Sequence, residues 1–481
     1  MMLRRFLVPL VLFSALLVQA QDASLVLRTS VGYRTQRNSL QLTDAQKQDA
    51  DRLYREAEQA NVAGKYGDAM RAMAHGTAVM QGKEWTPAAE FSAAVRTKLD
   101  HAMLEPGQHA RLMVTALFPP QLPPEMQKFT ETPVLRAAGG SENSLGNEIA
   151  ASPSKLPQAI EIVVPNVPPG DYQVELRIAA GQTSLATVRV PAHIQSLSEA
   201  VARLKARLAK APRENAAALA TAGYAVTLYE RADSGDANPA RIHFADEFAA
   251  ANAMLDALEG GKDPFAEKRG DLHKAYRSAA DNTLQPYRLF IPDSYTAAKS
   301  WPLVVALHGM GGDENSMFDA YAGEVKKNAE RLGFLVVCPK GRDTASMYRG
   351  AAEQDVMDVL AEVRRDYKID ARRIYLMGHS MGGYGTWSTA MDHPDVFAAL
   401  GPISGGGNAA GMVKLKDIPQ FVVHGDADPT VPVTQSRTMV EAGKKAGANI
   451  VYVEVPGGNH ISVAAPNIGP MFDFFARQAR P

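Results

Sequence analysis

The amino-acid sequence predicts an α/β protein: a doubly wound, mostly parallel sheet in the C-terminal part, preceded by a helical segment and a small β-sandwich. After about residue 282, apolar strand-like runs alternate with helical patterns, which is typical of a parallel sheet covered by helices. Runs such as Leu303–Leu307 are apolar throughout, as in strands buried on both faces. Between residues 106 and 194, short β-branched runs of alternating polarity are separated by proline and glycine, which is typical of a sandwich.

The composition is that of a soluble globular protein of several domains. The chain has 481 residues, of which 46% are hydrophobic and 21% charged. Its net charge of -1 provides no basic field for nucleic acid or an anionic membrane. We therefore expect a small or neutral partner and no nucleic acid.

The first twenty residues have the pattern of a secretory signal peptide. Arg4 and Arg5 precede an apolar run up to Val18, and residues 18–20 form a small-x-small cleavage pattern. The alternative is an uncleaved membrane anchor, which needs about 18 to 20 apolar residues, whereas this run is shorter and contains Pro9. We expect cleavage after residue 20, a periplasmic or secreted protein, and no membrane attachment afterwards.

The sequence predicts neither a disulfide nor a metal or organic cofactor. Cys338 is the only cysteine, and it lies in an apolar strand-like run, where a free cysteine is usually a small buried hydrophobe. A catalytic thiol is the less favoured interpretation. Sulfur ligands for zinc are lacking, and no His-Glu-x-x-His motif occurs.

Three modules are expected before the C-terminal domain. Residues 21–105 are predicted to be helical, and glycines near residues 64–67 predict a turn between two helices. The pair resembles one tetratricopeptide hairpin, but no second copy follows, so an ordinary hairpin packed on a neighbour is preferred. Residues 106–195 are the predicted β-sandwich, in which Tyr172 is the only aromatic residue of the clearest strands, an argument against carbohydrate binding. Residues 196–281 form a helical connection. The sandwich strands are expected near 110–118, 160–164, 172–178 and 184–190.

Residues 282–481 form the predicted α/β domain. Its strands are expected near 287–291, 303–307, 335–338, 374–377, 398–403, 420–423 and 451–455, and its helices near 316–331, 352–367, 381–392, 434–446 and 468–477.

The pentapeptide Gly378–Gly382 has the context of a nucleophile elbow, because a strand-like run precedes it and a helical pattern follows. In such an elbow a serine occupies a tight strand-to-helix turn, and flanking glycines allow close backbone approach. The positive end of the helix dipole then favours developing negative charge. Ser380 is the predicted nucleophile.

A serine hydroxyl needs a base and a group that orients the base. One strand runs into a loop with Asp426 and Asp428, and the next runs into a loop with His460. Because sites form beyond the carboxyl ends of parallel strands, we expect these loops at one edge of the sheet. Asp428 is predicted to orient the base, since Pro429 and the following turn fix its backbone, whereas Asp426 is expected to accept local backbone amides.

His460 has four rivals as the base, each at a position that predicts a local role instead. His379 lies at the elbow, His308 and His424 lie at strand ends, and His393 lies at a helix terminus.

The glycine-rich run 307–312 is expected to turn backbone amides toward the site. We assign the N–H groups of Met310 and of Met381, the residue after the nucleophile, to an oxyanion hole.

Six motifs lie within residues 282–481: YRLFIP at 287–292, HGMGG at 308–312, DARRIY at 370–375, GHSMGG at 378–383, HGDAD at 424–428 and GNH at 458–460. Together they resemble the α/β-hydrolase superfamily. They are similar above all to the secreted esterases grouped with polyhydroxybutyrate depolymerases and feruloyl and acetylxylan esterases, and to prolyl-oligopeptidase-like predicted peptidases. The resemblance implies an exported serine hydrolase that cleaves small-molecule or polymer-borne carboxylic esters through a Ser-His-Asp triad and an acyl-enzyme.

Two alternatives remain. The same triad could serve a peptidase, although the chain is shorter than a propeller-bearing prolyl oligopeptidase and shows no blade repeat. The protein could instead be a non-catalytic surface interaction protein, against which the intact motifs argue.

Overall fold

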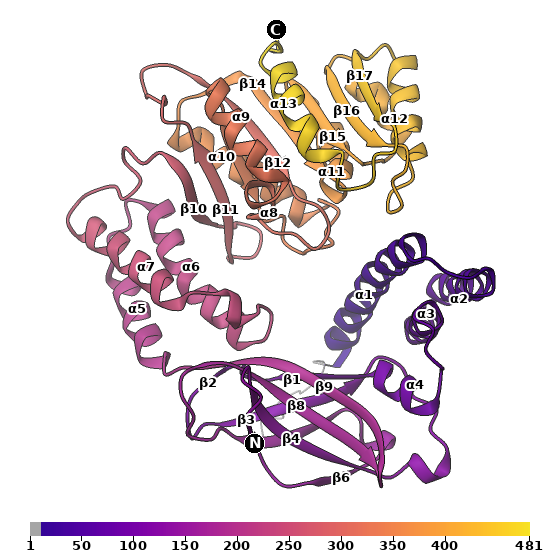
Figure 1. The fold of residues 1–481 in the computed structure, drawn as a ribbon. Coiled ribbons are helices and arrows are strands. Elements are labelled where there is room, and N and C mark those ends of the chain that lie inside the picture. The colour runs from indigo at the N-terminus through magenta and orange to yellow at the C-terminus, as the bar shows by residue number, and fades with distance from the viewer. Residues whose placement is uncertain (1–10) are drawn as a thin grey trace, which may run out of the picture. The chain divides into compact units, whose positions relative to one another are not determined.

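The computed structural model of the protein describes residues 11–481, and their side chains from residue 23 onward (Figure 1). The predicted signal peptide lies outside the residues whose side chains are described. The chain forms two compact units, the first comprising the chain up to Val201 with Leu228–Phe244, the second Ala202–Thr227 with Ala245–Pro481. None of the helices described has both the length and the apolar character needed to cross a membrane.

The first unit begins with four helices, α1(Val11–Ser39), α2(Asp44–Val62), α3(Tyr66–Met80) and α4(Pro87–Ala94). Helix α2 starts at a capping box, in which Gln46 N–H donates to Thr43 Oγ1 at 3.3 Å and Thr43 N–H donates to Gln46 Oε1 at 3.0 Å. The predicted turn separates α2 from α3, and this hairpin packs on α1, where Tyr33 Oη donates to Ala50 O at 2.7 Å.

The helical prediction for residues 21–105 is wrong at its end, because β1(Val95–Leu99) follows directly after α4. β-Branched Val95 and Thr97 favour a strand, and β1 pairs antiparallel with β3(His109–Ala116). Sheet pairing outweighs the helical pattern that precedes it.

Two sheets share one core in the first unit, as the sandwich prediction expects. One has the order β1-β3-β7, and the other β2-β9-β8-β4-β5, with β6 paired to β4. Buried Leu112 of the first sheet and Leu176 of the second belong to the same cluster. The remaining strands are β2(Met103–Leu104), β4(Phe129–Ala137), β5(Glu142–Ser144), β6(Ile149–Ala151), β7(Gln158–Val163), β8(Gly170–Ala180) and β9(Thr183–Ile194).

Helices α5(Ser198–Lys210), α6(Ala216–Asp233) and α7(Phe244–Glu259) follow, as predicted for residues 196–281. The prediction is again wrong at its end, because β10(Gly270–Arg277) pairs antiparallel with β11(Leu284–Ile291). The charged residue Lys274 interrupts the apolar pattern by which this strand could have been predicted. Its side chain is buried, and its ammonium group lies over the rings of Phe265 and Tyr367 while contacting Asp366 at 3.2 Å.

The sheet of the second unit has eight strands in the order β10-β11-β13-β12-β14-β15-β16-β17. From β13 to β17 all neighbours are parallel, and β10 and β11 form an antiparallel edge. The α/β prediction is confirmed. The further bounds are β12(Trp301–Leu307), β13(Leu335–Pro339), β14(Ile369–His379), β15(Ala399–Ile403), β16(Gln420–Gly425) and β17(Ile450–Val455).

Both faces of this sheet are covered by helices. In β12, Val305 belongs to one buried cluster and its neighbour Val304 to another, because successive side chains point to opposite faces. Helices α10(Ala351–Asp366), α11(Met381–Asp392) and α12(Thr434–Lys445) cover the first face, and α9(Glu324–Leu332) and α13(Ala464–Phe475) the second. Cys338 is buried in the second cluster.

The helix predicted over residues 316–331 is interrupted. It divides into α8(Ser316–Asp319) and α9, because Tyr321 and Ala322 between them have left-handed backbone conformations with φ of 54° and 55°. The remaining helices of the domain begin and end within four residues of their predicted bounds.

Candidate active site

Ser380 lies between the end of β14 and the start of α11, in the strand-to-helix turn that the sequence predicts. Its φ of 59° and ψ of -118° place it in a strained region for a residue with a side chain. Glycine is required around it. A Cβ on Gly382 would overlap the carbonyl oxygen of Leu307, and one on Gly383 would lie 2.6 Å from that of Ile403.

The three residues predicted to form the triad lie in a connected row. His460 Nε2 is 2.9 Å from Ser380 Oγ, and His460 Nδ1 is 2.7 Å from Asp428 Oδ2. The side chain of Asp428 is fully buried, and that of His460 is 11% exposed. A base within hydrogen-bond reach of a hydroxyl, and oriented by a carboxylate, can take its proton.

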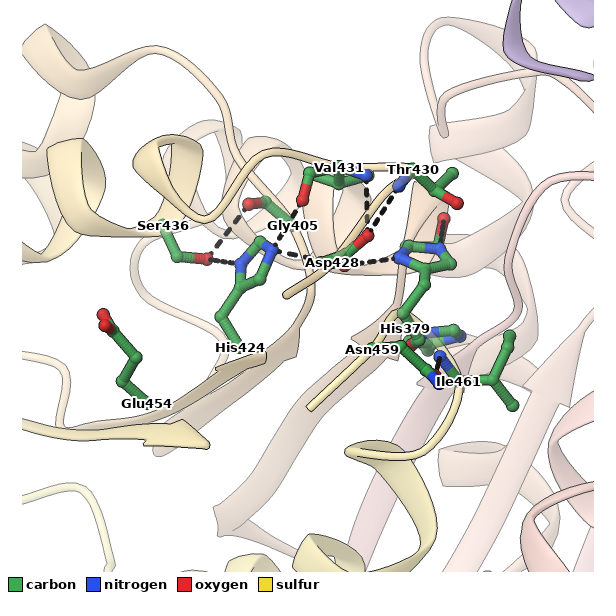
Figure 2. Close-up of polar contacts among 12 residues, drawn as sticks. His379, Gly405, His424, Asp428, Thr430, Val431, Ser436, Glu454, Asn459 and Ile461 are labelled. Carbon is green, nitrogen blue, oxygen red and sulfur yellow. Dashed lines mark hydrogen bonds and ion pairs between the residues drawn. The ribbon is translucent and has the colours of Figure 1, made fainter. Parts of the chain in front are cut away.

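The carboxylate of Asp428 is held from several directions (Figure 2). Thr430 N–H and Val431 N–H donate to Oδ1 at 2.8 and 2.9 Å, while His424 Nε2 lies 3.3 Å from Oδ2. Burial by itself would raise the pKa of Asp428, but the hydrogen bonds from His424, His460 and Val431 outweigh it and hold that pKa well below its usual range.

Asp426, the rival acid, joins two loops. Its Oδ1 accepts the N–H of Gly457 at 2.7 Å, so it connects the acid-bearing loop to the loop that carries His460. Within the second loop, Asn459 Oδ1 accepts the N–H groups of Ile461 and Ser462 at 3.1 and 2.9 Å. Each of the two aspartates therefore has a distinct set of partners.

The four rival histidines all have local partners. His379 Nε2–H donates to the backbone oxygen of His460 at 2.8 Å, and its Nδ1 is 2.9 Å from Tyr321 Oη. Burial, followed by the charge of His460, lowers the pKa of His379 to about 4. His308 bonds the backbone oxygens of Gly309 and Lys340, His424 contacts Asp428, and His393 pairs with Glu353.

The glycine-rich loop after β12 lies against the elbow. A Cβ on Gly309 would lie 3.4 Å from Ser380 Cβ. The backbone N–H groups of Met310 and Met381 have no backbone carbonyl partner in the part of the chain that the structure describes, whereas Gly311 N–H donates to Thr344 O at 2.8 Å. Two free amides near the serine are what an oxyanion hole requires.

The segment after β13 packs against both parts of this predicted hole. Met347 N–H faces Met381 Sδ at 3.4 Å, and buried Tyr348 donates to His308 O at 3.3 Å. Met347 and Tyr348 have positive φ angles of 54° and 49°. Sequence reasoning did not assign Tyr348 or Tyr321, whose roles depend on left-handed conformations in loops.

Among the residues with described side chains, no group of three or more His, Cys, Asp or Glu is arranged to hold a metal ion. The contacts from Ser380 through His460 to Asp428 support nucleophilic chemistry, with the serine hydroxyl as the attacking group.

Comparison with known proteins agrees with this geometry. The family model described as the prolyl oligopeptidase family matches residues 345–413, which contain the elbow. The chain is 31% identical over 141 residues to a bifunctional acetylxylan esterase/xylanase of Neocallimastix patriciarum, an alignment that covers 29% of this chain and 21% of the relative. It is 28% identical over 183 residues to a probable feruloyl esterase C of Aspergillus flavus, covering 37% of this chain and 68% of the relative.

The sequence similarities and the topology indicate the same fold: a parallel sheet covered by helices, with a serine in a strand-to-helix turn. The C-terminal domain has an α/β-hydrolase fold. Among solved structures, a thermostable esterase aligns with 80% of this chain and 100% of its own, at 18% identity and a TM-score of 0.39. The chain spans about a fifth of the bifunctional relative and about two thirds of the feruloyl esterase.

Proposed function

We propose that the protein is an exported serine hydrolase that cleaves carboxylic esters. The observation that carries this proposal is the row of contacts from Ser380 through His460 to Asp428, at 2.9 and 2.7 Å. The curated relatives named above are esterases, which supports an ester rather than an amide as the substrate.

The reaction follows from the positions of the side chains. His460 Nε2 accepts the proton of Ser380 as Oγ attacks the acyl carbon, and the resulting oxyanion faces the N–H groups of Met310 and Met381. His460 then gives the proton to the leaving alcohol, and an acyl-enzyme remains. Water, activated by the same imidazole, attacks the acyl carbon and releases the acid, which restores the serine hydroxyl.

The decisive experiment compares Ser380→Ala with the wild type. The wild type is expected to hydrolyse p-nitrophenyl acetate and to react with a fluorophosphonate probe, and Ser380→Ala to do neither while keeping its circular dichroism spectrum. Ser388→Ala, on the same helix α11, is the matched control and should retain both activities. Undiminished labelling of Ser380→Ala would refute the assignment.

A peptidase is the second candidate, because the matching family model is that of the prolyl oligopeptidases. Hydrolysis of short acyl, feruloyl and polyester substrates, compared with prolyl amides at equal concentration, distinguishes the two. A higher kcat/KM for the amides would favour the peptidase.

Export is proposed from the N-terminal sequence, and N-terminal sequencing of the protein from culture medium or periplasm should begin at Gln21. A preparation that is folded but inert toward every ester and amide tested would instead favour an interaction protein.

A further inference from the structure

Resting on the proposed function, we infer that His424 is a positioning residue, which acts on His460 through the carboxylate that the two imidazoles share. His424 lies at the end of β16 with no exposed surface, four residues before Asp428. The proposed mechanism does not use it, although it is one of two imidazoles within 3.3 Å of Asp428 Oδ2.

The hydrogen bonds of His424 determine which ring nitrogen carries a proton (Figure 2). Its Nε2 lies 3.0 Å from the carbonyl oxygen of Val431 and 3.3 Å from Asp428 Oδ2. Both atoms can only accept, so Nε2 must be the donor. The single Nε2–H of His424 is hydrogen-bonded to Val431 O, and its longer contact is with Asp428 Oδ2, the atom that also accepts the N–H of His460 at 2.7 Å.

The other side of the ring is held as firmly. Nδ1 is 2.7 Å from Ser436 Oγ, which also lies 3.0 Å from Gly405 O. The hydroxyl of Ser436 can donate to Nδ1 when His424 is neutral, or to Gly405 O when Nδ1 is protonated. The ring keeps one orientation in either state, so the N–H at Nε2 stays between Val431 O and Asp428 Oδ2.

Loss of this donor has a defined electrostatic consequence. With one N–H fewer near Oδ2, the negative charge of Asp428 is less dispersed, and protonated His460 is stabilised more strongly. The rate of hydrolysis should then reach its plateau at a higher pH. Asp428 Oδ2 would also lose a restraint on its position.

Other titratable groups face the same region. Glu454 of β17 is the strand partner of His424, His460 follows β17, and His379 ends β14. Glu454 is already paired with Arg437 and Tyr452. Because these groups are unchanged in variants of His424, a difference in the pH profile reports on the donor.

The test compares two substitutions. His424→Phe keeps a ring without nitrogens, whereas His424→Gln can place an amide N–H where Nε2 lies. For His424→Phe we expect kcat to fall about tenfold, KM to stay within about twofold, and the acidic limb of the kcat/KM profile to move up by about half to one pH unit. His424→Gln should restore both quantities to near wild-type values. His393→Gln, in the His393–Glu353 pair at the far end of α11, is the matched control and should match the wild type.

A folded His424→Phe variant whose kcat/KM profile has the acidic limb of the wild type would overturn this role for His424. An equal loss of activity in His424→Phe and His424→Gln, with the acidic limb unmoved, would also overturn it, because a packing role would produce that result. If His424→Phe does not fold, His424→Asn replaces it, because the shorter amide does not reach the position of Nε2. Failure of the proposed function is a separate result: the wild type would then hydrolyse no ester, or Ser380→Ala would hydrolyse it equally well.

Discussion

Replacement of Asp428 by asparagine is the sharpest test of the electrostatics of this site. The carboxylate accepts the N–H groups of Thr430, Val431 and His460, and His424 Nε2 lies 3.3 Å from it. Asparagine can accept the two backbone amides with its oxygen, but its NH2 group then faces the imidazoles. His460 is driven to accept at Nδ1, so its proton moves to Nε2, where it opposes the hydroxyl that the base must deprotonate.

The size of the effect follows from the burial of the pair. The side chains of Asp428 and His460 are 0% and 11% exposed, so an effective dielectric constant of about 20 applies rather than that of water. At a separation of about 4 Å between charge centres, the lost attraction for protonated His460 is about 4 kcal/mol. Because about 1.4 kcal/mol corresponds to a factor of ten in rate, kcat/KM should fall about 1,000-fold.

The assay is the initial rate of p-nitrophenyl acetate hydrolysis at pH 8, with the fluorophosphonate labelling rate of Ser380 as a second measurement. Asp426→Asn is the matched control, because its carbonyl oxygen can still accept the N–H of Gly457, and it should stay within about threefold of the wild type. A loss below tenfold in folded Asp428→Asn, or an equal loss in Asp426→Asn, would refute the reasoning.

Three further predictions concern stability and reactivity. His379 has a pKa lowered to about 4, so between about pH 6.5 and 4 the unfolded state binds more protons than the folded state and acidification destabilises the fold. His379→Gln should remove about 3 kcal/mol of this pH dependence, measured by urea unfolding at pH 7 and 4; parallel pH curves for the two proteins would contradict it. In Gly382→Ala the new Cβ would overlap Leu307 O, so the free energy of unfolding should fall by at least about 2 kcal/mol. Gly139→Ala is the control, because a Cβ there meets open space, and the change should be less than about 0.5 kcal/mol. Equal losses in the two variants, measured by chemical denaturation, would refute this prediction. Burial raises the pKa of the Cys338 thiol well above its ordinary value, so Ellman's reagent should detect no thiol in the native protein and one in urea; rapid reaction of the native protein would show that the strand is accessible.

The sequence predicts the strands of the hydrolase domain well where apolar residues dominate, as in β12 and β13. It misleads where a polar residue is buried. Lys274 faces aromatic rings in β10, and Glu131 and Pro133 interrupt the apolar pattern of β4, so both strands were missed. Their assignment depends on partners distant in the sequence, which a local pattern does not contain.

At the site, residues in local motifs could be predicted from the sequence, whereas contacts that depend on loop conformation could not. Ser380, Asp428 and His460 each lie in a short motif at a strand end, so the sequence alone singles them out. The contact of His424 with Asp428 depends on how the loop after β16 turns back on its strand, although the spacing of four residues was a usable signal. The contact of Tyr321 with His379 depends on the left-handed conformations of Tyr321 and Ala322, which these residue types do not predict.

The distances at the site depend on bonds between loops as much as on the sheet. Strands β16 and β17 are parallel neighbours, so their loops start side by side, and Asp426 joins the two through Gly457. The elbow leaves β14, which is separated from β16 by β15, and here His379 binds the backbone oxygen of His460. His379, the residue before Ser380, thus holds His460, the proposed base. Because a displacement of about 1 Å can cost about 100-fold in rate, this bond should matter to kcat more than to substrate binding.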